Sequence, residues 1–434
     1  MSLTSDYGLA VELADQRLDE VWSDGGATAT WTDITSDVRA LSIDRGLDLG
    51  ARHPKTGQCR VVLNNSASEY DPDNSGASIY PDVQPGAAIR VTADTSAAAT
   101  KPLFYGYLPG RRSISFTINP GSNDAVASWT VTDPSAWIGN YTVNTPDILT
   151  TLEDGTSGNT ALGQITSVIG DLAQSPSESS TYTSGSNGPP LFNPPEFTGS
   201  ALGLIQRIAD SEGGWFFFDA SGGWVYLDRY ASVDNTTMSS VQGTLSDDAA
   251  AVDYRDGSLV YGWGHTAVTR VDVEPYPAAL DVDEDFSVLY REGNIVETDA
   301  GDFGWTEATL AVKTHLETEE YCRSLGRLLL GRYSQVQLAP MTLTVKPKRS
   351  STERDFVFSL DLFHKVTVEW TPPGLSQRST DCFVTAIRHE ISQGQDWVCV
   401  LTLQPSAVLG LASSSSLFQF DTAGKGFDQG YFGP

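Results

Sequence analysis

Acidic side chains at short spacing are the first residues of this 434-residue chain that suggest a chemical role. Hard cations such as Ca²⁺ bind several oxygen ligands supplied by closely spaced carboxylates. One segment places its residues at the first, third, fifth, sixth and twelfth positions of an EF-hand-like loop: Asp71, Asp73, Ser75, Gly76 and Asp82. Pro72 and Pro81 interrupt it and no helical pattern flanks it, so an ordinary turn-rich loop is the alternative.

A second acidic segment contains Asp281, Asp283, Asp285 and Glu292. Phe286 stands where a calcium loop needs glycine for its sharp turn, which favours a solvated acidic turn. The sequence leaves calcium binding open at Asp71–Asp82 and at Asp281–Glu292, and it predicts no metal site and no cofactor.

The histidines form no known catalytic motif. They are His53, His265, His315, His364 and His389, and the chain contains neither GxSxG nor HExxH. Hydrolysis of cell-wall sugars needs two carboxylates that face each other across a cleft, and 55 acidic residues offer too many pairs for the sequence to select one. We therefore predict no catalytic residue and a protein that is not an enzyme.

Tryptophan and cysteine are the other residues that can suggest a site. Trp215 and Trp224 lie in strand-like patterns, where core packing is favoured over sugar stacking. The four cysteines, Cys59, Cys322, Cys382 and Cys399, lack CxxC spacing and are expected to be reduced core residues. A disulfide between Cys382 and Cys399 is the alternative, if these residues face each other across neighbouring strands.

The formal net charge of −28 argues against tight nucleic-acid binding, because such binding needs Lys and Arg to neutralise phosphates. An acidic wall repels DNA, which suits a pore through which DNA passes without specific binding; solubility alone is the alternative explanation. No apolar stretch of about 18 residues occurs and the N-terminus carries no secretory pattern, so no membrane span and cytoplasmic synthesis are expected.

The pattern of the chain divides it into modules. Residues 1–137 carry about six strand signals with period-two alternation, as in Gln58–Leu63, and predict a small barrel or sandwich. Residues 138–232 are mixed. We expect one helix capped by Thr160, a second capped by Ser200 that stops at Gly213, and an aromatic hairpin over residues 215–228.

Residues 233–250 resemble a linker, and strands return over 251–405 with one helix that begins near Thr318. Residues 406–434 form a tail with aromatics among glycines, which suggests either a docking peptide or a frayed terminus. The candidate partner-docking residues are Phe418, Phe420, Phe427, Tyr431 and Phe432.

The ordered strand segments resemble a known family. Residues 31–41, 57–65 and 70–73, followed by Pro85–Gly86, Leu103–Phe104 and Val131–Asp133, are similar to the N-terminal barrel of tail-tip and minor tail proteins from long-tailed phages of Gram-positive bacteria. The helix and hairpin over 202–229 resemble the middle domain of baseplate-hub proteins, and the strands over 341–403 resemble their second barrel.

This resemblance implies a mainly β fold with a smaller α+β part: two tube-type β-barrel domains and an intervening mixed domain. It further implies a homotrimeric tail-tip hub at the distal end of the virion, assembled in the host cytoplasm. Such a ring closes the tail tube, meets the distal-tail or tail-tube ring, holds the tape-measure protein and the fibres or receptor-binding proteins, and opens for DNA. The alternatives are a hexameric distal-tail ring subunit, a carbohydrate-binding adhesin and a cell-wall hydrolase.

Overall fold

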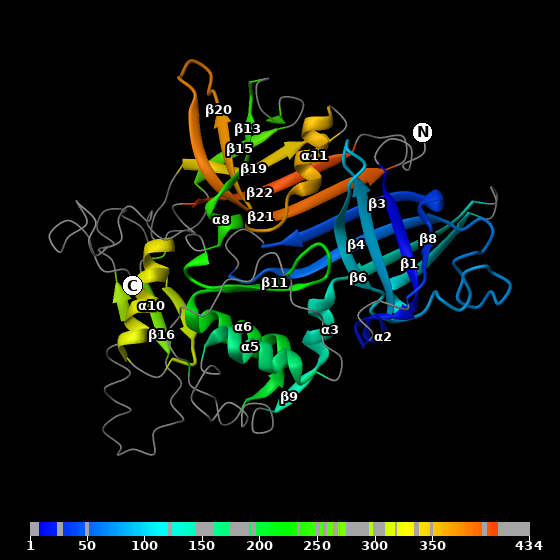
Figure 1. The fold of residues 1–434 in the computed structure, drawn as a ribbon, viewed down its shortest axis with the longest axis horizontal. Helices are drawn as coiled ribbons and strands as arrows, with labels where there is room; N and C mark the ends of the chain where they lie inside the picture. Colours follow the sequence, from blue (N-terminus) through cyan, green and yellow to red (C-terminus); the bar gives the residue numbers. More distant parts are fainter. Residues whose placement is uncertain are drawn as a thin grey trace.

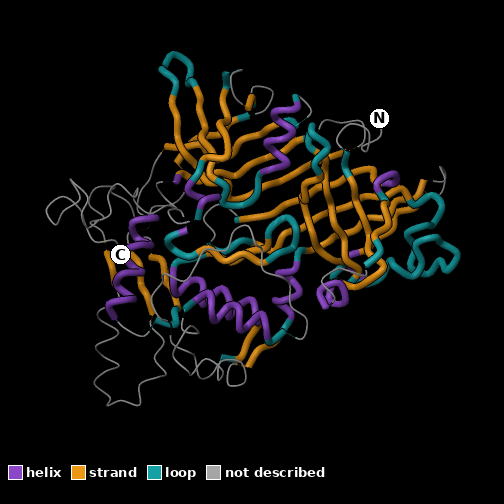
Figure 2. The backbone as a smooth tube through the Cα atoms, in the orientation of Figure 1, coloured by secondary structure: helices purple, strands orange, loops and turns teal. Residues whose placement is uncertain are grey.

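The computed structural model of the chain describes residues 8–23, 29–47, 52–119, 124–144, 160–172, 191, 197–231, 235–248, 252–254, 258–263, 268, 270–274, 295–297, 309–316, 319–333, 338–347, 350–392 and 397–406. Within these residues the fold is mainly β, and the longest helices lie on one side of the large group of strands (Figures 1 and 2). The predicted fold class, mainly β with a smaller α part, is confirmed. None of the described helices is long and apolar enough to cross a membrane.

One large sheet of 15 described strands runs through the molecule and has two halves. The N-terminal half contains β1 (Ala10–Arg17), β2 (Trp31–Asp33), β3 (Val38–Gly46), β4 (Lys55–Asn64), β5 (Ala87–Asp94), β6 (Thr100–Tyr107), β7 (Ile114–Asn119) and β8 (Asp124–Thr132). The C-terminal half contains β13 (Val241–Ser246), β14 (Val252–Asp253), β15 (Leu259–Trp263), β19 (Leu338–Val345), β20 (Lys365–Trp370), β21 (Arg378–Ser392) and β22 (Val398–Pro405). Helices α2 (Leu18–Ser23), α8 (Thr236–Ser239) and α11 (Ser351–Ser359) accompany these strands.

The two halves are joined by the pairing of β3 with β21. Residues 40–46 lie antiparallel to residues 386–392, with Ile43 opposite His389 and Arg45 opposite Ile387. Side chains alternate along a strand, so Leu41, Ile43 and Arg45 share the buried face of β3. We call this pairing the seam.

Strand β21 changes its partner within its length. On one edge, residues 378–383 pair with β20 and residues 386–392 pair with β3, whereas β22 occupies the other edge. Between these stretches the carbonyl of Thr385 accepts a hydrogen bond from the Leu47 N–H at 2.8 Å. One continuous strand thereby belongs to both halves.

A helical layer lies against the sheet (Figure 1). It contains α3 (Pro134–Asn140), β9 (Thr142–Asn144), α5 (Ala161–Gly170), β10 (Thr198–Ser200), α6 (Ala201–Glu212), β16 (Arg270–Glu274), β17 (Ile295–Glu297), β18 (Thr309–Lys313) and α10 (Glu319–Tyr333). The core residues of α5 and α6 pack with Val271, Val312 and Leu325 in one cluster, so the layer draws on two separate parts of the sequence.

The hairpin β11 (Trp215–Phe218) and β12 (Trp224–Leu227) separates the two layers. Every residue of both strands is buried. Alternate side chains face different cores: Trp215, Phe217, Val225 and Leu227 join the sheet core, and Phe216, Phe218, Trp224 and Tyr226 join the helical core. The hairpin therefore binds the helical layer to the sheet.

The predicted helices and hairpin are present. Thr160 Oγ1 accepts the Gly163 N–H at 3.2 Å at the start of α5, and Ser200 Oγ accepts the Gly203 N–H at 3.1 Å at the start of α6. Gly213 ends α6 with a left-handed φ of 71°. Helix α10 occupies the region where the spacing predicted a helix near Thr318.

The packing departs from the expected division in two places. The segment 233–250, expected to be a linker, contains α8 and β13, and β13 pairs in parallel with β20. Residues 270–333, expected within the second barrel, contribute β16, β18 and α10 to the helical core. Both differences arise from pairings between residues far apart in the sequence, which local composition does not report.

A substitution at Gly46 tests the importance of the seam for stability. It has a φ of +114°, and a Cβ atom there would lie 2.2 Å from the Thr385 carbonyl oxygen. We expect Gly46→Ala to lower the free energy of unfolding by about 2–4 kcal/mol, because both the backbone strain and the clash fall on paired strands. Urea denaturation followed by tryptophan fluorescence measures the change.

Gly110→Ala is the matched control, because nothing lies within 4 Å of a Cβ at that position. An equal loss of stability in both variants would contradict the structural importance of the close contact at Thr385.

Candidate functional site

Arg45 lies where the two sheet halves and the helical layer meet. Its side chain is 6% exposed, and its Nη2 donates to the Asp361 Oδ1 atom at 2.8 Å and to the Phe218 carbonyl at 3.0 Å. Arg45 belongs to the N-terminal half, Asp361 follows α11 in the C-terminal half, and Phe218 ends the first hairpin strand. One guanidinium thereby links three parts of the fold.

Asp361 accepts further hydrogen bonds. The Ala220 N–H donates to its Oδ2 atom at 2.9 Å, and the Leu362 N–H donates to Oδ1 at 2.8 Å. A buried ion pair is tolerated when its remaining lone pairs are satisfied, which is the situation here. Asp361 therefore binds both Arg45 and the turn of the hairpin.

Asp133 fixes the start of the helical layer nearby. It caps α3 by accepting the Ser135 N–H at 3.0 Å, and its Oδ2 accepts the Gly57 N–H of β4 at 2.6 Å. Burial raises the pKa of Asp133 to about 6, although the hydrogen bonds from Ser135 and Gly57 act in the opposite direction.

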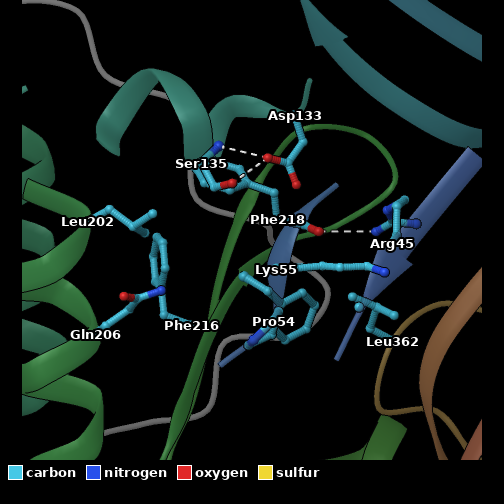
Figure 3. Close-up of a pocket in the computed structure, with 12 residues that line it drawn as sticks. Arg45, Pro54, Lys55, Asp133, Ser135, Leu202, Gln206, Phe216, Phe218 and Leu362 are labelled. Atoms are coloured by element: carbon cyan, nitrogen blue, oxygen red, sulfur yellow. Dashed lines mark hydrogen bonds between the residues drawn. The ribbon is translucent and has the colours of Figure 1, made fainter. Parts of the chain in front are cut away.

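A pocket is present at this junction, between Arg45, Lys55, Asp133 and Phe216 (Figure 3). Leu202 and Gln206 of α6 line its far side. Its volume of about 10 Å³ is roughly what one water molecule needs. The junction is suited to holding the layers together and is too small to accept an organic ligand.

His389 occupies the seam beside this junction. The Trp397 Nε1–H donates to its Nδ1 atom at 3.2 Å, and the ring is 3% exposed. Burial, together with the nearby charge of Arg45, lowers the pKa of His389 to about 3. The ring is therefore neutral at physiological pH and serves as a hydrogen-bond acceptor in the core.

A second buried polar cluster lies where α6 meets the hairpin. The Tyr226 hydroxyl donates to the Glu212 carboxylate, and Arg229 Nε donates to the Glu212 carbonyl at 2.8 Å. Burial raises the pKa of Glu212 to about 7. Arg332 of α10 donates to the Gly213 carbonyl at 2.7 Å and lies 4.6 Å from the centre of the Trp215 ring, so the cluster anchors α10 to the hairpin.

The acidic segment Asp71–Asp82 forms a series of turns rather than a ligand cage. Asp71 Oδ1 accepts the Asp73 N–H at 3.0 Å, and the Asn74 side chain accepts the Gly76 N–H at 3.1 Å. No group of three or more His, Cys, Asp or Glu side chains placed to hold a metal occurs in the described part of the chain. The segment Asp281–Glu292 lies outside the described residues.

The candidate docking residues also lie outside the described residues, which end at 406: Phe418, Phe420, Phe427, Tyr431 and Phe432. Core packing of Trp215 and Trp224 is confirmed, since they are 4% and 3% exposed. Cys382 and Cys399 are buried free thiols on neighbouring strands but lie opposite Pro405 and His389 rather than each other. The alternative of a disulfide between them was therefore wrong.

Sequence reasoning did not select Arg45 or Asp361. A signal for Arg45 was present, because Leu41, Ile43 and Arg45 follow at period two and an arginine on an apolar face needs a buried partner. No local signal identified Asp361 as that partner, because 316 residues separate the two.

The fold is similar to those of solved tail proteins. A tail protein from Neisseria meningitidis matches with a TM-score of 0.55 at 13% identity, over 93% of this chain and 97% of that chain. The 43 kDa tail protein of prophage MuSo2 from Shewanella oneidensis matches with a TM-score of 0.53 at 13% identity, over 92% and 97%. The chain has the fold of phage tail proteins.

The likeness is one of structure. No protein-family profile matches the sequence. No curated protein matches it either.

Replacing Arg45 should separate the three parts that it links. We expect Arg45→Met to lower the free energy of unfolding by about 3–5 kcal/mol, because Asp361 would remain as a buried charge without its cation. Arg388→Met is the control: Arg388 pairs with Glu390 on the same seam, with side chains 54% and 48% exposed, and such a pair contributes about 0–1 kcal/mol. Denaturant midpoints compare the two, and equal small losses would contradict the proposed role.

Glu212 should make stability depend on pH. Its folded pKa of about 7 exceeds the ordinary 4.5, so the folded state holds the proton more tightly. The stabilisation that results from this tighter proton binding is fully present below pH 4.5 and is lost as the pH rises through 7. Relative to the Glu212→Gln variant, the free energy of unfolding of the wild-type protein should fall by up to about 3 kcal/mol between acidic and mildly alkaline pH. Melting temperatures of both proteins across this range measure it; a difference that is constant with pH would argue against a raised pKa.

Proposed function

We propose that the protein is a non-enzymatic structural subunit of a phage tail tip, a hub that forms a ring at the distal end of the tail tube. The observation that carries the proposal is the shared fold, which extends over nearly the whole length of two tail proteins. In this role each half of the sheet acts as one tube-type barrel, and the helical layer lies outside the ring.

The seam supports a hub with two barrels in each chain. Because β21 belongs to both halves, their relative placement is set by backbone pairing rather than by a flexible connection. Three copies would then present six sheet halves around one axis, which matches a sixfold tube. A distal-tail ring would instead need six chains.

The charge supports passage of DNA through such a ring. Each chain carries a formal charge of −28, so a trimer would carry about 84 negative charges, and their field would repel phosphates. DNA would therefore pass without specific binding.

The remaining partners follow from the same role: the tail-tube or distal-tail ring, the tape-measure protein, and the fibres or receptor-binding proteins. The aromatic residues from Phe418 to Phe432 are our candidates for docking one of these partners. An aromatic side chain contributes a large contact area for a small loss of conformational freedom.

The mass of the purified full-length chain tests the proposal. For a 46.7 kDa chain, light scattering over a concentration series should approach about 140 kDa, the mass expected for threefold symmetry. Negative-stain images should then show a threefold ring with a central hole. A cell-wall suspension incubated with the same preparation should keep its turbidity.

Other results would change the conclusion. A sixfold ring would favour the distal-tail subunit. A chain that clears the suspension, and loses this activity when one carboxylate is replaced, would favour the wall hydrolase; a monomer that binds host glycans would favour the adhesin.

A further inference from the structure

Large apolar side chains are exposed mainly on two edge strands. Among the described residues, seven large hydrophobic side chains are exposed, and four of them lie on β7 and β15. On β7, Phe116 is 41% and Ile118 is 69% exposed; on β15, Val260 is 51% and Tyr261 is 41% exposed. Single exposed apolar residues are ordinary, but their concentration on strand edges marks a surface for association.

Both strands have one unpaired edge within the described chain. β7 pairs only with β8, over residues 114–119, and β15 pairs only with β19, over residues 259–263. Neither strand carries a charged residue. Proteins usually protect an exposed edge with lysine, proline or a short strand, and these two edges lack such protection.

The two edges are matched in length and lie on opposite halves of the sheet. β7 has six residues and β15 has five, whereas β2 has three and β14 has two. The seam already joins the halves of one chain through antiparallel pairing of seven residues on each strand. A contact of similar length is thus available between the outer edges.

The charges near the two edges are complementary. Arg112, which is exposed, lies two residues before β7 begins at Ile114. On the other half, Tyr261 of β15 packs on Trp370 at 6.2 Å, next to Glu369, and the charges of Asp247, Asp253 and Glu369 all act on Tyr254. In an acidic chain, an arginine near the start of one edge strand and carboxylates around Tyr254, five residues before the other, favour contact between the two edges.

We propose that β7 of one copy of this chain pairs edge to edge with β15 of a second copy. The proposal rests on the proposed function and names the contact that builds the ring. Within one chain β7 and β15 belong to different halves, so the contact is head-to-tail: each copy uses β7 on one side and β15 on the other. A head-to-tail contact closes into a ring when its rotation permits.

Cysteine cross-linking tests the contact. The four native cysteines are buried, so thiols introduced at exposed strand positions react selectively. Thr117→Cys places a thiol on β7 and Val260→Cys places one on β15. A mixture of the two full-length variants, treated with a short bismaleimide, should give a covalent dimer that neither variant gives alone.

Leu375→Cys is the matched control, because Leu375 is 56% exposed in the connection between β20 and β21. Mixed with the Thr117→Cys protein, it should give no dimer. Equal cross-linking of the Thr117→Cys protein with itself would overturn the proposal in favour of a symmetric β7 contact.

Charge insertion provides a second measurement. The double variant Phe116→Lys, Ile118→Lys changes only exposed side chains, so its melting temperature should remain that of the wild type while its self-association weakens at least about tenfold. Leu375→Lys should associate as the wild type does. A ring that survives the double variant and gives no β7–β15 cross-link would overturn this contact and leave the proposed function standing; a wild-type chain that is monomeric at every concentration would overturn both.

Discussion

The arrangement of the whole molecule depends on the point where β21 exchanges one neighbour for another. Up to residue 383 its edge is paired with β20, and from residue 386 the same edge is paired with β3. The change requires β3 to end against β21 at Thr385, and Gly46 allows this approach because it has no Cβ. The backbone at residues 384–385 keeps its partners, since Val384 bonds to residues 363 and 364 and the Thr385 carbonyl accepts from Leu47. These bonds pair both backbone groups of Val384 and the carbonyl of Thr385, and buried backbone groups need such partners inside a core.

This pairing also fixes where the charges lie. A shift of one residue in the register of a strand turns every side chain to the other face. With the observed register, Leu41 and Ile43 enter the core and Arg45 reaches Asp361 and the hairpin. A shifted register would expose both apolar residues and leave Asp361 buried without its cation. The ion pair therefore contributes to the specificity of the register as well as to stability.

The sequence predicted those parts of the fold that local interactions determine. Thr160, Ser200 and Gly213 mark helix ends through bonds within a few residues, and the aromatic hairpin follows from two strand patterns around a tight turn. The seam, the parallel pairing of β13 with β20, and the contribution of β16 and α10 to the helical core depend on residues far apart in the chain. The period-two pattern of β3 placed Arg45 on the apolar face, but only the fold could supply Asp361.

The hairpin explains why the helical layer and the sheet form one body. A strand pair with one apolar face would need a polar face toward water, but Trp215–Phe218 and Trp224–Leu227 are buried on both faces. Burying each large apolar side chain contributes about 1.5–3 kcal/mol, so detaching either layer would expose a row of them. The junctions inside the chain are thus apolar surfaces joined by a few buried polar contacts, such as those of Arg45 and Glu212. The outer edges at β7 and β15 combine apolar side chains with unpaired backbone groups, and the same physical chemistry that closes the interior would make them bind another strand.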